Sequence, residues 1–104
     1  IFKEEAEILL DFDIKRAIAG LRWNLPWFET LNAPRQVVLI NLCLNMGITK
    51  LLKFHNTLEA LQSGDYPSAA LGLRSSKWYT QVGPGRGDTL IKMIETGEYP
   101  KETP

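Results

Sequence analysis

The stretch Asn32–Gly47, NAPRQVVLINLCLNMG, decides the fold because it predicts one helix that is apolar on almost every side. Its apolar residues fall all round a 3.6-residue period: Val37, Val38, Leu39, Ile40, Leu42, Cys43, Leu44 and Met46. A helix of this kind must be enclosed, and it is too short to span a bilayer, so other parts of the protein must enclose it. The sequence therefore predicts a buried central helix.

The ends and the polar residues of this stretch support the same prediction. The side chain of Asn32 can cap free N–H groups, Pro34 suits a first turn, and Gly47 can take a left-handed cap conformation. Asn41 and Asn45 are four residues apart and therefore share one helix face. We expect that face to look into a cleft or to bond buried backbone.

Composition limits the classes of function. The chain has 104 residues, of which 44% are hydrophobic, so it can form one domain with a modest core. Twelve basic and twelve acidic residues cancel, which argues against a nucleic-acid partner. With one cysteine, Cys43, and one histidine, His55, no internal disulfide or zinc site can form, and we expect no metal or cofactor. No apolar run or export signal appears, so we expect a soluble chain without a membrane partner.

Helical patterns flank the central stretch on both sides. Lys3–Ala19 has apolar residues at spacings of three and four, which predicts an amphipathic helix about 25 Å long that ends at Gly20. We interpret residues 1–20 as a long connecting helix. About six shorter helices follow, and no segment alternates as a strand would. The prediction is an all-α fold in which residues 21–104 form a compact multi-helix lobe around the central helix.

The aromatic segment LRWNLPWFETL, residues 21–31, has two possible roles. Trp23, Trp27 and Phe28 surround Pro26, and such residues commonly fill a gap between helices. The alternative is a platform on which a sugar stacks. We expect Trp78 to lie in the core as well, because tryptophan is usually buried.

No catalytic arrangement emerges from the residues themselves. A glycosidase needs two carboxyl groups that face each other, but the acids here sit at predicted caps or on polar helix faces. These acids are Asp11, Asp13, Glu29, Glu59, Asp65, Asp88 and Glu95. His55 has no serine in a nucleophile context and is expected at the surface or at a cap. The glycine-rich run 83–87 follows no strand and lacks the lysine of a phosphate loop. The residues alone predict a helical domain with a polar notch.

Several patches read together resemble a known family, the phage-type lysozymes of glycoside hydrolase family 24. The patches are NLCLNMG (41–47), FHNTL (54–58), GDYPSAA (64–70), SKWYTQ (76–81) and the segment from Arg86 to Gly97. The opening segment IFKEEAEILLDFDI, residues 1–14, looks like the long helix that joins the two lobes in that family. The resemblance covers nearly the whole chain in the right order.

The resemblance implies an endolysin that hydrolyses the bond between N-acetylmuramic acid and N-acetylglucosamine in peptidoglycan. Such an enzyme would reside in the host cytoplasm before lysis and act on the periplasmic cell wall. In the family, the catalytic glutamate and the assisting aspartate and threonine precede the joining helix, where this sequence starts. We therefore expect no catalytic residue here, an inactive chain when alone, and an N-terminal lobe of the same protein as partner.

The resemblance also implies which residues face the peptidoglycan glycan strand. They are Leu44, Asn45, Thr57, Gly72 and Lys77. Gly72 stands where a polar amide can contact substrate, and Lys77 stands where an arginine can occur, which keeps the charge but loses the bidentate fork. Together these residues would form the far wall of the sugar cleft.

Two other functions remain open at this point. One is a non-catalytic peptidoglycan-binding or regulatory module that keeps the cleft wall without the chemistry. The other is a DNA-binding helix-turn-helix domain, against which the neutral net charge argues.

Overall fold

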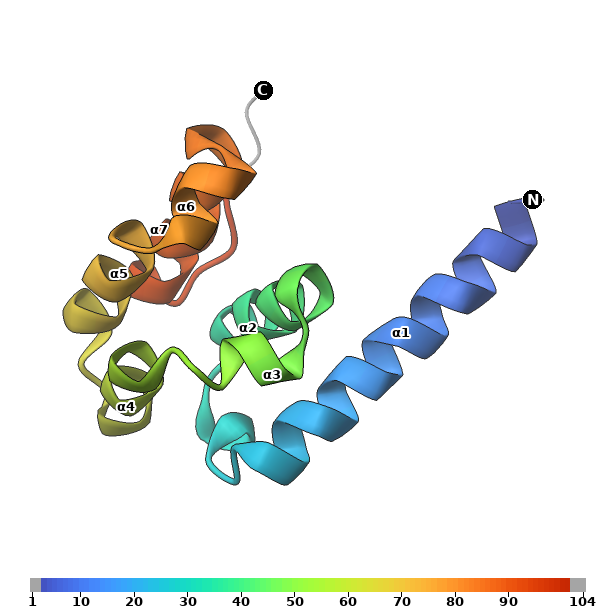
Figure 1. Cartoon of the computed structure of the whole chain (residues 1–104), viewed down its shortest axis with the longest axis horizontal. Helices are drawn as coiled ribbons and strands as arrows, with labels where there is room; N and C mark the ends of the chain where they lie inside the picture. The colour runs from blue at the N-terminus through green and yellow to red at the C-terminus, as the bar shows by residue number, and fades with distance from the viewer. Residues whose placement is uncertain (1–2, 102–104) are drawn as a thin grey trace.

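A computed structural model describes the backbone of residues 3–101 and the side chains of residues 11–83 and 85–101. Its elements are α1 (Lys3–Asn24), η1 (Phe28–Thr30), α2 (Ala33–Met46), α3 (Ile48–Leu51), α4 (His55–Ser63), α5 (Tyr66–Arg74), α6 (Lys77–Val82) and α7 (Pro84–Thr96) (Figure 1). No strand occurs between residues 3 and 101, so the predicted all-α class is confirmed. Within the same range, no helix combines the length and the apolar character that crossing a membrane requires.

Helix α1 is longer than predicted, because it continues through Gly20 to Asn24. The expectation that Gly20 ends the helix is wrong. A glycine inside a helix costs only about 1 kcal/mol relative to alanine, and Leu21, fully buried in the next position, anchors the extra turn. The helix ends where Pro26 removes a donor and disfavours helical geometry at the residue before it. Figure 1 shows α1 running away from the other helices towards its N-terminal end.

Helix α2 is buried on one face rather than on all sides. Val38, Leu39 and Leu42 are at most 1% exposed, whereas Leu44 is 42% exposed and Val37 is half-buried. Full enclosure was therefore a wrong expectation, because the helices packed against α2, namely α1, α3 and α7, cover only part of its circumference. The predicted ends are in the right places: Asn32 Oδ1 accepts the N–H of Arg35 at 3.4 Å, and Gly47 follows the last helical residue. Gly47 does not take the expected left-handed cap conformation, because its φ of 86° is combined with an extended ψ of 156°.

The start of α2 is joined to the end of α7. The Arg35 side chain donates from Nε to the carbonyl of Ile94 at 2.8 Å and from Nη2 to the carbonyl of Glu95 at 3.3 Å. Asn32 Nδ2 donates to the carbonyl of Gly97 at 2.9 Å. Gly97 adopts the left-handed conformation and ends α7. These bonds satisfy carbonyls that the last turn of a helix leaves without partners.

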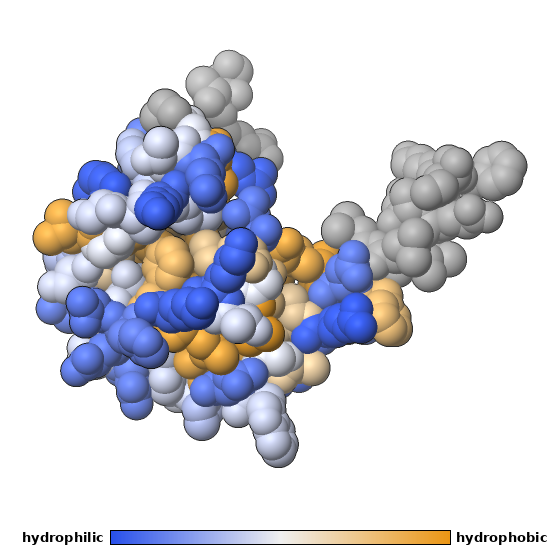
Figure 2. Space-filling view, in the orientation of Figure 1, coloured by the Kyte–Doolittle hydropathy of each residue, from blue (hydrophilic) through white to orange (hydrophobic). Residues whose placement is uncertain are grey.

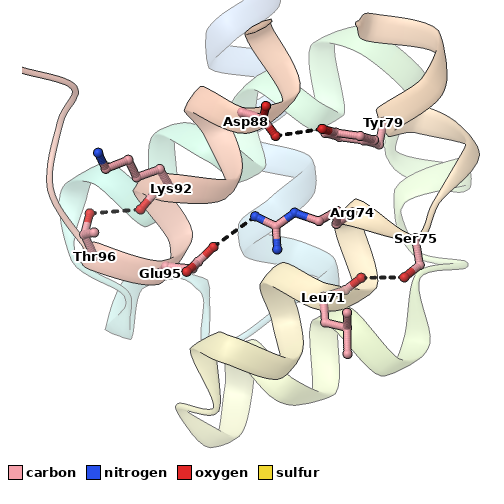
Figure 3. Close-up of polar contacts among 8 residues, drawn as sticks. All are labelled: Leu71, Arg74, Ser75, Tyr79, Asp88, Lys92, Glu95 and Thr96. Atoms are coloured by element: carbon pink, nitrogen blue, oxygen red, sulfur yellow. Dashed lines mark hydrogen bonds and ion pairs between the residues drawn. The ribbon is translucent and has the colours of Figure 1, made fainter. Parts of the chain in front are cut away.

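Helix α7 also holds α5 and α6 in place. Leu73 of α5 and Ile91 and Ile94 of α7 are fully buried in the common core. At the surface, Arg74 pairs with Glu95 at 3.3 Å, and the Tyr79 hydroxyl donates to Asp88 at 2.8 Å (Figure 3). α5, which also packs against α4, is thereby fixed with its C-terminal end beside α6.

The aromatic predictions are partly correct. Phe28 and Trp78 are 1% and 3% exposed, and Trp27 packs half-buried against the core. Trp23 does not fill a gap between helices, because 86% of its surface is exposed. Two residues after the buried Leu21, it is rotated by about 200° on the continuing helix and faces away from the core.

Candidate binding cleft

A cleft of about 810 Å³ opens where the end of α2, α3, the start of α4, the end of α5 and α6 meet. Its lining residues are Asn45, Met46, Lys50, Lys53, Phe54, His55, Asn56, Thr57, Gly72, Ser75, Ser76, Lys77, Trp78 and Gln81. Figure 2 shows hydrophilic side chains reaching over apolar ones in the middle of this face. Five separate segments of the chain therefore converge on one hollow.

Thr57 and Gly72 form the closest contact in the cleft. Thr57, in the first turn of α4, is 5% exposed and is the one buried polar residue among the described side chains. A Cβ placed on Gly72 would lie 2.3 Å from Thr57 Oγ1, so the hydroxyl stands where a side chain at position 72 would begin. Glycine at this position is what lets α5 approach α4 so closely.

The Thr57 hydroxyl is available to a ligand. No hydrogen bond to another described residue engages it, and no fully enclosed side-chain N or O atom in the described part lacks a partner. The hydroxyl must therefore open into the cleft that Thr57 lines. By contrast, Ser76 donates to the carbonyl of Leu73 at 2.6 Å and accepts the N–H of Tyr79 at 3.4 Å, so its hydroxyl serves the α6 cap.

The charged residues that line the cleft are all basic. Lys50, Lys53 and Lys77 are exposed at the cleft, and the lining contains no aspartate or glutamate. Helix α4 also begins here without a side-chain cap, which adds the weak positive end of its dipole. The cleft can bind anionic or hydroxyl-rich groups, but it cannot supply a carboxylate for acid–base chemistry.

Four of the five residues implied by the resemblance lie together in this cleft: Asn45, Thr57, Gly72 and Lys77. Leu44 lies on α2 with 42% of its surface exposed but does not line the cleft. A substrate-binding role for any of the five stays a prediction.

The two asparagines of α2 have separate roles. Asn45 lines the cleft, whereas the half-buried Asn41 accepts a hydrogen bond from Arg86 at the start of α7. Sequence reasoning missed Lys50 and Lys53 as cleft residues. Their three-residue spacing could have placed them on one side of a helical turn, but the sequence does not show which side faces the cleft.

Other reactive groups lie away from the cleft. Burial raises the pKa of the Cys43 thiol above its ordinary value, because the thiolate would lose its hydration. A buried thiol with a raised pKa is inert, which agrees with the predicted core role. Within the described residues, no group of three or more histidine, cysteine, aspartate or glutamate side chains could hold a metal ion.

Comparison with known proteins places the chain among lysozyme-like sequences. No protein-family model matches it. Probable T4-type lysozyme 2 of Dictyostelium discoideum is 31% identical over 100 residues, and Probable T4-type lysozyme 1 of the same organism is 28% identical over 100 residues. The chain is therefore similar in sequence to proteins named as T4-type lysozymes. The Pre-baseplate central spike protein Gp5 of Enterobacteria phage T4 is likewise similar, with 33% identity over 100 residues.

Each of these alignments covers 93% of the chain. The chain itself spans 58% of the length of each Dictyostelium lysozyme and 17% of the spike protein. The match therefore extends through nearly all of this chain but through only part of each relative.

Proposed function

We propose that this chain is the C-terminal lobe of a phage-type lysozyme and forms one wall of the cleft that holds a peptidoglycan glycan strand. The observation that carries the proposal is the convergence of Asn45, Thr57, Gly72 and Lys77 in one cleft of about 810 Å³. The similarity to proteins named T4-type lysozyme supports the same substrate. The reaction would be hydrolysis of the N-acetylmuramic acid to N-acetylglucosamine bond, by a protein held in the host cytoplasm until lysis.

In this proposal the chain binds and does not catalyse. Glycoside hydrolysis needs two carboxyl groups about 5 to 9.5 Å apart across the scissile bond, and the described cleft lining has none. The carboxylates would come from an N-terminal lobe that α1 connects to the cleft. Residues 1–20 would then act as the connecting helix and residues 21–104 as the lobe.

Two side chains are suited to hold a sugar or its acetamido group. The Thr57 hydroxyl can donate and accept, and the Asn45 amide can do both as well, so each can bond a hydroxyl or a carbonyl of the strand. The buried Trp78 supports this wall from below rather than stacking on sugar. Losing one such neutral hydrogen bond costs about 1 kcal/mol, or roughly fivefold in affinity.

The first test uses purified Gram-negative sacculi with two proteins: the 104-residue chain and the polypeptide of natural length. We expect the chain to sediment with sacculi without releasing reducing ends, and the natural-length polypeptide to release them. Thr57→Val, which keeps the shape but removes the hydroxyl, should weaken sedimentation about fivefold. Thr80→Val is the matched control, because Thr80 is exposed on α6 outside the cleft lining.

Three results would contradict the proposal. Release of reducing ends by the chain alone would mean that its own acids catalyse. If the folded chain does not bind sacculi, it does not form a wall of the glycan-binding cleft. Binding without hydrolysis by the natural-length polypeptide would instead identify a non-catalytic peptidoglycan-binding module.

A further inference from the structure

We propose that Lys50 and Lys53 make this cleft select glycan that carries peptide stems, by pairing with the carboxylates of the stem. The inference rests on the proposed function, because it assumes that peptidoglycan enters the cleft. It assigns a specificity role to two residues that the family resemblance does not single out.

The charge distribution is the first observation. Acidic and basic residues are equal in number over the chain, yet the cleft lining includes Lys50, Lys53 and Lys77 and no acidic residue. An unbalanced set of like charges around one hollow raises the local concentration of anions and favours their binding. Such a lining therefore predicts an anionic ligand group, not merely a polar one.

The second observation is that these lysines form no ion pair with another side chain that the structure describes. The ion pairs of the described part lie elsewhere: Asp11 with Lys15, Arg22 with Glu29, and Arg74 with Glu95. Lys50 and Lys53 are exposed, and the N–H of Lys53 donates to the carbonyl of Lys50 at 3.1 Å in a single tight turn. Two ammonium groups therefore extend from one short turn, and the α6 residue Lys77 lines the same cleft.

The chemistry of peptidoglycan identifies the anion. The sugar units are neutral, because the lactyl carboxyl of muramic acid is tied up in an amide with the peptide. The stem peptide carries several free carboxylates. Neutral donors such as Asn45 and Thr57 suit the sugar, whereas Lys50 and Lys53 have no anionic partner in the strand except the stem.

Nucleic acid is a poorer match to the same charges. Nucleic-acid binding surfaces carry net positive charge over a face, and this chain has a formal net charge of zero. Single-stranded bases also need exposed aromatic platforms, whereas in the cleft lining Trp78 is 3% exposed and Phe54 is half-buried. A short peptide attached to a sugar suits the cleft better.

Calorimetric titration of the full chain with two probes tests the proposal. The first probe is the disaccharide tetrapeptide of Gram-negative peptidoglycan, and the second is chitotetraose, which is neutral and has no stem. The Lys50→Gln/Lys53→Gln double variant should bind the peptide-bearing probe about tenfold more weakly and chitotetraose unchanged. Lys92→Gln, an exposed lysine on α7 outside this cleft, is the matched control and should change neither affinity.

Salt gives a second readout that a structural effect would not produce. Raising the ionic strength from about 0.01 M to about 1 M shortens the Debye length from about 30 Å to about 3 Å. The wild-type chain should lose affinity for the peptide-bearing probe over this range and keep its affinity for chitotetraose. The double variant should show a much smaller salt effect.

Several outcomes would overturn the proposal. If the double variant binds both probes with wild-type affinity, or loses affinity for both equally, the lysines do not recognise the stem peptide. Binding of chitotetraose by the wild type would still support the sugar site. If the wild type binds neither probe, the proposed function fails together with this inference. If single-stranded DNA binds more tightly than the peptide-bearing probe and depends on the same lysines, the cleft is a nucleic-acid site.

Discussion

Replacing Gly72 by alanine should destabilise the chain although it removes a glycine from a helix. In α5, alanine would gain up to about 1 kcal/mol in helix propensity. Its Cβ, however, would stand 2.3 Å from Thr57 Oγ1 and 3.5 Å from Thr57 Cβ. The first of these distances is far inside van der Waals contact, so Thr57 must rotate or the two helices must separate.

The size of the effect follows from that geometry. Thr57 is β-branched and short, so it has few other rotamers, and its backbone is already fixed in the first turn of α4. Forcing an extra methyl group into such a contact costs about 1 to 3 kcal/mol. The net change for Gly72→Ala is then a loss of up to about 2 kcal/mol. In a Thr57→Ala background the colliding oxygen is gone, and the same substitution should stabilise by up to about 1 kcal/mol.

A double-mutant cycle measures this reversal of sign. The four proteins are unfolded in urea and followed by circular dichroism, with m-values compared to check that the unfolding transition stays the same. We expect a coupling free energy of about 1 to 3 kcal/mol between the two positions. For a domain of this size 1 kcal/mol corresponds to about 4 to 8 °C, so melting temperatures give an independent check. Equal effects of Gly72→Ala in both backgrounds would refute the steric reasoning.

Three further predictions concern the rest of the fold. Arg35→Met should destabilise by about 2 kcal/mol, because two helix-end carbonyls lose a charged donor, and amide exchange in the last turn of α7 should accelerate in the native state. Trp78→Ala should cost about 3 to 5 kcal/mol and Trp23→Ala less than about 0.5 kcal/mol in the same urea assay, since the first is 3% and the second 86% exposed. The pKa of Cys43 is raised by burial, and that of Tyr79 is raised first by its hydrogen bond to a neighbouring carboxylate. The unfolded chain therefore deprotonates first, and the free energy of unfolding should fall as pH rises above the ordinary thiol value of 9.0, whereas a flat urea midpoint from pH 7 upwards would contradict this.

The helices could be predicted because their signals are local. Asn32 acts at the start of α2 as expected, and Asp65 and Gly64 act at other helix ends in the same local way, through their own geometry and the adjacent turn. The apolar run likewise predicted the burial of Val38, Leu39 and Leu42 without knowledge of their neighbours, although it did not distinguish them from the exposed Leu44. Local sequence signals were therefore sufficient to predict that these segments are helices.

The errors concern residues whose structure depends on packing against segments that are distant in sequence. Gly20 lies inside α1 because Leu21 is held in the core, and Trp23 is exposed because the helix continues past it. The open side of α2 around Leu44 depends on how much of its surface the other helices cover. A single sequence contains none of this information in its local pattern.

The candidate cleft likewise has features that could be predicted from the sequence and features that could not. The resemblance named Asn45, Thr57, Gly72 and Lys77, and the structure places them together. It could not reveal that the Thr57 hydroxyl fills the space beside Gly72, nor that Lys50 and Lys53 line the same cleft. Such facts depend on the distance between helices that are far apart in sequence.

The bonds from the start of α2 to the end of α7 also bear on how the chain is synthesised. Arg35 leaves the ribosome 59 residues before the carbonyl of Ile94, its partner. At about 5 to 20 residues per second, that interval lasts about 3 to 12 s, whereas helices of this size pack in well under a second. During that interval the α2 surface that later contacts α7 stays uncovered in the nascent chain. A chain that is released before Ile94 is added lacks the carbonyls that Arg35 binds, so its α2 cannot be joined to the end of α7.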